Sequence, residues 1–170
     1  MSMWRRVLWL GGMAAVLTPA IAQTASISQA YADKSGSVKI VMSDGKTVLV
    51  PKEHGATGAD NVRIAPDGRT VGWLATWPNP EPDRSWEVLP STLIIWRDGE
   101  IVHKFQTDLT FYAWSFWKGS AQVAYRTGPM HGPAPNYELH DIATGRLLQH
   151  FLDDDNADAA KLPEWVKELK

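Results

Sequence analysis

The side chains best suited to chemistry in this chain are its histidines, but their spacing makes neither a catalytic nor a metal site. The sequence has five of them: His54, His103, His131, His140 and His150. No two have the spacing of metal ligands, and the chain contains no hydrolase, phosphate-loop, zinc-protease or dinucleotide motif. His140 precedes Asp141 in the order of a base and an orienting carboxylate, yet a strand-edge histidine before a turn aspartate explains the pair better. We predict no catalytic residue, and a hydrolase with His131 or His140 as base is the weaker alternative.

An acidic run near the C-terminus follows part of the calcium-loop pattern. Asp154, Asn156 and Asp158 occupy alternate positions, as calcium ligands do. The sixth position of such a loop is normally glycine and the twelfth a bidentate glutamate, whereas here they are Ala159 and Trp165. Acidic residues also favour the start of a helix through its dipole. We interpret the run as an acidic linker and predict neither a metal nor a cofactor.

Tryptophan, with nine residues in 170, is the feature that most suggests binding. Trp73, Trp96 and Trp114 lie in apolar runs and are expected in a β core. Trp77 and Trp86 instead flank the proline-rich segment 78–85, which is typical of a loop.

A second proline-rich segment, GPMHGPAPN at 128–136, makes the equivalent connection between the next two hairpins. Equivalent connections of neighbouring repeats emerge on the same side, so we expect the two loops side by side, on a face where binding residues concentrate. Proline also lowers the entropy that such loops lose on binding. The candidate ligand- or partner-binding residues are Trp77, Arg84, Trp86, Met130, His131 and Tyr137.

The first 22 residues have the layout of a secretory signal peptide. Arg5 and Arg6 form a positive n-region, the run 7–21 is apolar, and residues 20–22 read Ala-Ile-Ala, a small-x-small cleavage site. The apolar run is shorter than the roughly 20 residues of a membrane anchor. We predict a periplasmic or secreted protein cleaved after Ala22, and the arginine pair leaves the Sec and twin-arginine routes open.

The remaining 148 of the 170 residues suffice for one domain with a core of its own. Two of the 17 basic residues leave with the signal peptide, so 15 basic residues face 19 acidic ones and the net charge is −4. This mild acidity argues against nucleic acid and against an anionic membrane surface. The chain has no cysteine, so disulfides and thiolate metal sites are excluded. No segment of the mature chain is apolar enough to span a membrane.

Five turn signals between apolar runs predict an all-β fold of about ten short antiparallel strands. Asp-Gly between such runs is a strong hairpin signal, because type I′ turns need positive φ at both central positions. The turns fall at 43–46, 66–69, 97–100, 117–120 and 143–145. Most of these runs are apolar at successive positions, which indicates strands that are buried on both faces.

The repeats resemble a known family. IAPDGRTVGWLA looks like the PDG-centred strand pair of WD40-like and TolB-like β-propeller repeats, and LIIWRDGEIVHKF and YELHDIATGRLLQHF look like the outer strand pair of such blades. The resemblance covers residues 37–151 and implies two to three blades. A closed propeller typically has four to eight, so the sheets either stay open or are completed by oligomerisation.

The predicted domains are the signal peptide 1–22, a polar lead-in 23–36, the β-propeller-like domain 37–151, and an acidic linker with an amphipathic helix at 152–170. In the last segment Leu162, Trp165, Val166 and Leu169 form one apolar stripe, and we expect this helix to lay Trp165 on the end of the β domain and to cover an edge strand. The expected function is an exported, non-enzymatic module that binds another protein or its own copy. The alternative is a small-ligand or glycan binder using Trp77 and Trp86.

Overall fold

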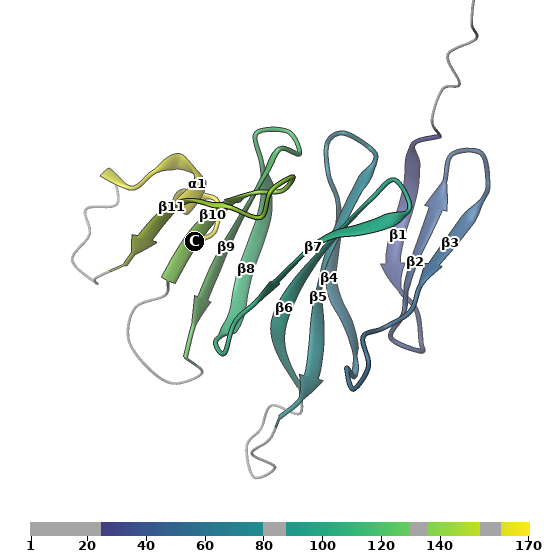
Figure 1. The fold of residues 1–170 in the computed structure, drawn as a ribbon, viewed down its shortest axis with the longest axis horizontal. Coiled ribbons are helices and arrows are strands. Elements are labelled where there is room, and N and C mark those ends of the chain that lie inside the picture. Colours follow the sequence, from purple (N-terminus) through teal and green to yellow (C-terminus); the bar gives the residue numbers. More distant parts are fainter. Residues whose placement is uncertain (1–24, 80–87, 130–135, 154–160) are drawn as a thin grey trace, which may run out of the picture.

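The structure, a computed structural model, describes residues 25–79, 88–129, 136–153 and 161–170. These residues form eleven antiparallel strands in three sheets, followed by one short helix (Figure 1). The all-β prediction is therefore confirmed. The elements are β1 Ile27–Ala32, β2 Val38–Met42, β3 Thr47–Val50, β4 Gly58–Ile64, β5 Thr70–Pro78, β6 Val88–Arg97, β7 Glu100–Gln106, β8 Thr110–Trp117, β9 Gln122–Gly128, β10 Asn136–Asp141, β11 Leu147–Leu152 and α1 Glu164–Lys167.

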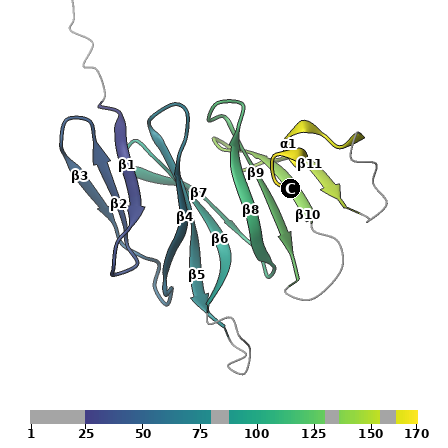
Figure 2. The ribbon, with the colours of Figure 1, turned by 180° about the vertical axis from the view of Figure 1, so that it is seen from behind.

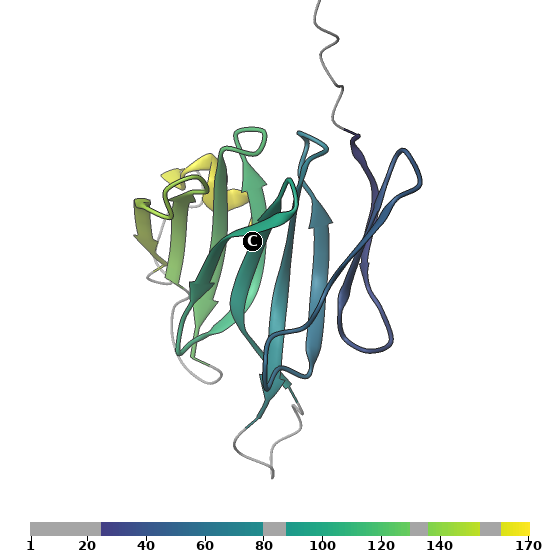
Figure 3. The same ribbon diagram turned by 45° about the vertical axis from the view of Figure 1, so that its right-hand side comes forward.

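Each sheet is a meander in which strands that follow one another in sequence are hydrogen-bonded neighbours. The first sheet has the order β1-β2-β3, the second β4-β5-β6-β7, and the third β8-β9-β10-β11. The three sheets stand in a row, and the same order is seen from behind and after a 45° turn (Figures 1, 2 and 3). Two four-stranded meanders and one three-stranded meander make a propeller-blade-like fold, and the row does not close into a ring.

The predicted turns lie where the sequence signals place them. Gly45, Gly99 and Gly145 have positive φ in the turns after β2, β6 and β10. Asp98 and Lys118 also adopt positive φ, directly before Gly99 and Gly119. Paired positive φ values match the right-handed twist of the flanking strands, so these two turns close their hairpins without splaying the strands.

Strand β1 lies inside the segment that the sequence predicted as a polar lead-in. It pairs with β2, with Ala30 opposite Ile40 and Tyr31 opposite Lys39. Only Ile27 of this strand is buried, so the apolar pattern that reveals the other strands is absent. The first sheet therefore has one strand more than the hairpin that the sequence predicted.

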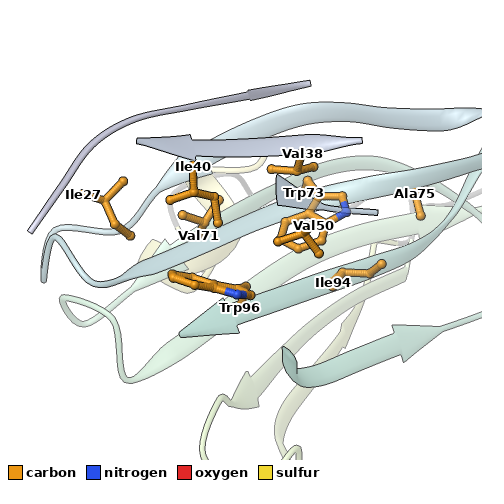
Figure 4. Packing of buried hydrophobic residues seen from close by; sticks show 9 residues of the cluster. All are labelled: Ile27, Val38, Ile40, Val50, Val71, Trp73, Ala75, Ile94 and Trp96. Carbon is orange, nitrogen blue, oxygen red and sulfur yellow. The ribbon is translucent and has the colours of Figure 1, made fainter. Parts of the chain in front are cut away.

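Two apolar layers join the three sheets, and strands β5 and β6 contribute to both. On one face Val71, Trp73, Ile94 and Trp96 pack against the first sheet (Figure 4). On the other face Leu74, Leu93 and Ile95 pack against the third sheet, around the fully buried Trp114. The central strands β5 and β6 are therefore buried on both faces, as their continuous apolar runs predicted.

The C-terminal segment covers the outer face of the third sheet. Leu162, Trp165, Val166 and Leu169 are all buried and pack on β9 and β10, so the predicted apolar stripe is confirmed. The regular helix is one turn, Glu164–Lys167, with Pro163 as its N-cap residue. The Trp165 indole nitrogen donates to Gln149 Oε1 on the edge strand β11 at 2.7 Å. Within the described residues no helix has the length and apolarity to cross a membrane.

Candidate functional site

The two ends of the row of sheets differ in how the chain connects its strands. At one end are the short turns after β4, β6 and β8, which side chains tie together. Arg69 makes a two-pronged ion pair with Asp98, at 2.9 and 2.6 Å, and Arg97 donates to the carbonyl of Ser120 at 2.7 Å. The backbone N–H of Asp67 donates to the Ser120 hydroxyl at 3.1 Å. The contacts of Ser120 with Arg97 and Asp67 join the third sheet to the second, and a smaller hollow of about 450 Å³ lies among these turns.

The opposite end carries the longer connections and a hollow of about 640 Å³. Strand β5 ends there, and so does β9, as both arrowheads show (Figures 1 and 2). The hollow lies within the size range of ligand pockets. The residues that line it come from the β3–β4 connection, from β5 and β6, and from the end of β7 with the residues after it: Glu53, His54, Trp77, Ser91, Thr92, Gln106, Thr107 and Asp108.

Trp77 is the aromatic member of this lining, which we call the Trp77 hollow. It lies near the C-terminal end of β5 and pairs with Leu89 across the sheet. Its side chain is half-buried and packs against the first apolar layer. The ring is thus anchored by the core and still contributes to an open surface, which is the arrangement expected of a rigid aromatic contact for a ligand.

Polar groups around Trp77 are numerous, and among the described residues one negative charge has no ion-pair partner. Lys104 Nζ lies 2.8 Å from Glu53 Oε1, so the charge of Glu53 is matched. Asp108 is exposed and makes no ion pair with the described residues. Thr92, a residue only 2% exposed, also lines the hollow. The Trp77 hollow therefore offers an indole, a carboxylate and a threonine hydroxyl.

The other predicted binding residues are placed differently. Tyr137 is fully buried between the third sheet and the C-terminal segment, and its hydroxyl has no hydrogen-bond partner among the residues that the structure describes. Strand alternation explains this: Tyr137 and Leu139 point to the outer face of the sheet, beneath Trp165. Tyr137 is thus a core residue and cannot meet a surface ligand. Arg84, Trp86, Met130 and His131 lie outside the described residues, as do positions 154–159 of the acidic run.

Sequence reasoning missed a cluster of three polar side chains between the second and third sheets. Tyr125 Oη donates to Glu138 Oε2 at 2.7 Å and lies 2.9 Å from His140 Nε2. His140 Nε2 is also 2.7 Å from Glu138 Oε2, and Nδ1 is 3.0 Å from the carbonyl of Gly145. The His140 ring stacks on Tyr125 and meets the edge of Phe105 from β7. The predicted partner Asp141 instead accepts two hydrogen bonds from Thr144.

The pKa shifts and hydrogen bonds of this cluster indicate a structural role rather than that of a catalytic base. The hydrogen bond with His140 lowers the pKa of Glu138 to about 2, against the opposing effect of burial and with further help from Tyr125. Burial raises the pKa of the Tyr125 phenol, and its hydrogen bond to Glu138 raises it further. Both nitrogens of His140 already face protein partners, so neither is left to take a proton from a substrate. Positions 138 and 140 share one face of a strand, and this period-two relation could have revealed the pair.

Comparison with known proteins assigns no family to the chain. No family model matches it, and no curated protein does. Among solved structures, hydrazine synthase of Kuenenia stuttgartiensis is similar over 70% of this chain and 32% of that chain, at 17% identity and a TM-score of 0.45. The chain thus spans about a third of that protein's length. A likeness this distant assigns no function. Among the described residues no three His, Asp or Glu side chains form a group that could hold a metal ion.

Proposed function

We propose that this chain is an exported, non-enzymatic β-repeat module that binds a protein partner at the end of its sheets where β5 and β9 terminate. The observation that carries the proposal is the Trp77 hollow. A half-buried indole from β5 meets polar side chains from three separate segments there. At the opposite end side-chain contacts hold short turns together around a smaller hollow, and binding residues concentrate on the longer loops of a rigid scaffold.

The localisation and the family belong to the same proposal. The charge and apolar pattern of residues 1–22 supports export with cleavage after Ala22. The PDG turn at Asp67 and the blade-like meanders support kinship with WD40-like or TolB-like propeller repeats. An open row of three sheets also leaves room for a second copy of the chain as the partner, which sedimentation equilibrium of residues 23–170 would measure.

The test is capture of a partner by immobilised residues 23–170 from exported proteins of the source cells. The variants are Trp77→Ala and Trp77→Phe, with Leu147→Ala as the control. Leu147 is 48% exposed and begins β11, at the end of the third sheet away from the hollow. Circular dichroism would first establish that all variants fold.

We expect wild type and Leu147→Ala to retain the same partner and Trp77→Ala to lose it, with Trp77→Phe intermediate. Equal capture by Trp77→Ala and wild type would contradict the proposed site, because the indole supplies the largest apolar contact there.

A glycan or other small neutral ligand is the second candidate. It is favoured by the hydroxyl and amide groups of Ser91, Thr92, Thr107 and Gln106 around the indole, since an aromatic face with nearby polar groups suits a sugar ring. A fluorescence titration with cell-wall oligosaccharides tests it. A response that vanishes in Trp77→Phe supports this candidate, and no response to any sugar removes it.

A further inference from the structure

We infer that the Trp77 hollow receives a cationic side chain, a lysine or arginine of the partner protein. This inference rests on the proposed function and names the chemistry of the group that enters the site. Three features carry it: the charge balance of the described lining, the half-buried indole and a threonine hydroxyl in the same lining.

The charge balance favours a cation over an anion. Glu53 and Asp108 are the two carboxylates of the lining, and no lysine or arginine is among its described members. Lys104 neutralises Glu53 from outside the lining at 2.8 Å. Among the described residues one negative charge, that of Asp108, is left to attract a ligand and to repel an anionic group.

The Trp77 indole also favours a cation, by a different mechanism. The face of an aromatic ring is electrostatically negative, and tryptophan attracts lysine and arginine cations more strongly than tyrosine or phenylalanine does. Trp77 is held by the first apolar layer, so its ring need not be ordered when a ligand arrives. The alkyl stem of a lysine or arginine also matches the apolar surface of the ring.

The hydroxyl of Thr92 offers the ligand a hydrogen-bond acceptor. Thr92 is 2% exposed and lines the hollow. An ammonium or guanidinium group donates several hydrogen bonds and accepts none. It can therefore use the Thr92 oxygen and the Asp108 carboxylate together, whereas a carboxylate or phosphate could not approach Asp108.

The experiment follows the Trp77 indole N–H signal of ¹⁵N-labelled residues 23–170, assigned by its loss in Trp77→Phe. The probes are N-acetyl-lysine-methylamide and its neutral counterpart with an acetylated ε-amine, added to about 50 mM because a single side chain binds weakly. The first pair of variants is Asp108→Asn and the charge-matched control Asp44→Asn. Asp44 lies in the β2–β3 turn, at the opposite end of the first sheet from Glu53.

We expect the cationic probe to shift the Trp77 signal and the neutral probe to leave it unchanged. Asp108→Asn should weaken binding about twofold to fivefold, as expected for one exposed charge pair, and Asp44→Asn should not change it. Lys104→Gln should tighten binding, since it frees the charge of Glu53. A variant that merely damages the fold cannot produce this gain.

Equal shifts with both probes, no shift with either, or no gain in Lys104→Gln would overturn the cation preference. None of these results would by itself remove the proposed function, because partner capture that depends on Trp77 is measured separately. If instead partner capture did not depend on Trp77 while the cationic probe still shifted the Trp77 signal, the hollow would be a cation site without the protein-binding role.

Discussion

Replacing Gly72 by alanine tests how closely the second and third sheets pack. A Cβ atom at Gly72 would lie 2.6 Å from Trp114 Cη2, 2.9 Å from Trp114 Cζ3 and 3.1 Å from Ile95 Cδ1. Both neighbours are fully buried, so they have no open space to move into. Gly72 does not have a positive φ, and the backbone itself therefore tolerates alanine. Any loss of stability therefore reports on the packing of position 72 against Trp114 and Ile95.

The size of the loss follows from two opposing effects. Forcing a methyl group into a close-packed core costs about 1–3 kcal/mol. Exchanging glycine for alanine where the backbone permits it returns about 0.4–1 kcal/mol through the unfolded chain. We expect Gly72→Ala to lower the free energy of unfolding by roughly 1–2 kcal/mol. Urea unfolding of residues 23–170, followed by circular dichroism, would show a lower midpoint at an unchanged m-value.

A double-mutant cycle with Trp114→Phe identifies the contact. Phenylalanine lacks the outer ring atoms that meet the new Cβ, so it should tolerate alanine at position 72. The two changes should then be less destabilising together than the sum of the single changes, with a coupling of about 1 kcal/mol. Additivity within about 0.5 kcal/mol, or a neutral Gly72→Ala, would refute the described packing of Gly72 on Trp114.

Three further predictions concern the cluster around Glu138, the turn at Asp67 and the C-terminal helix at Trp165. Glu138 has a folded pKa of about 2, below its unfolded value. The stability it contributes, on the order of 1–2 kcal/mol once its partial exposure to solvent is allowed for, is full above about pH 4.5 and is lost as the pH falls toward 2. Glu138→Gln should therefore flatten the acid unfolding curve in that range, and an unchanged curve would exclude this structural role. Burial opposes ionisation of Asp67, but hydrogen bonds from Arg69 and Thr70 outweigh it and lower its pKa. Asp67→Asn should cost about 1 kcal/mol in urea unfolding, more than Asp44→Asn at the exposed β2–β3 turn, and equal costs would contradict this. Trp165→Ala should cost about 3–5 kcal/mol and speed hydrogen exchange in β10, whereas unaltered exchange would mean that the helix does not protect the sheet.

The hairpins could be predicted from the sequence because their signals are local. Gly99 adopts the positive φ that its Asp-Gly pair predicted. Within its own turn, the Asp67 carboxylate accepts hydrogen bonds from the backbone N–H groups of Arg69 and Thr70. Strand β1 could not be recognised in this way. Its residues are mostly exposed, and it is placed by pairing with β2 and by the hydrogen bond from Ile27 N–H to the carbonyl of Gly68, 41 positions further on.

The cluster of Tyr125, Glu138 and His140 was predictable in part. Alternation along a strand places Glu138 and His140 on one face, but Tyr125 joins them only through the register of β9 against β10. The same alternation turns Tyr137 to the opposite face, where the C-terminal segment buries it. Sequence proximity to a proline-rich loop was therefore a poor guide for Tyr137, because its side chain follows the strand and not the loop.

Only part of the Trp77 hollow could be predicted from the sequence, because its residues come from separate connections of the meander. Trp77 stood out because an indole at the end of an apolar strand, next to prolines, is conspicuous on its own. Glu53, Thr92 and Asp108 do not stand out, since each is an ordinary polar residue more than ten positions from the next. They meet because the meander returns every second connection to the same end of the row, so the β3–β4, β5–β6 and β7–β8 connections all open there. The turns between them are tied at the far end by Arg69 and Arg97. A change in the charge of the hollow should therefore alter binding with little effect on the fold.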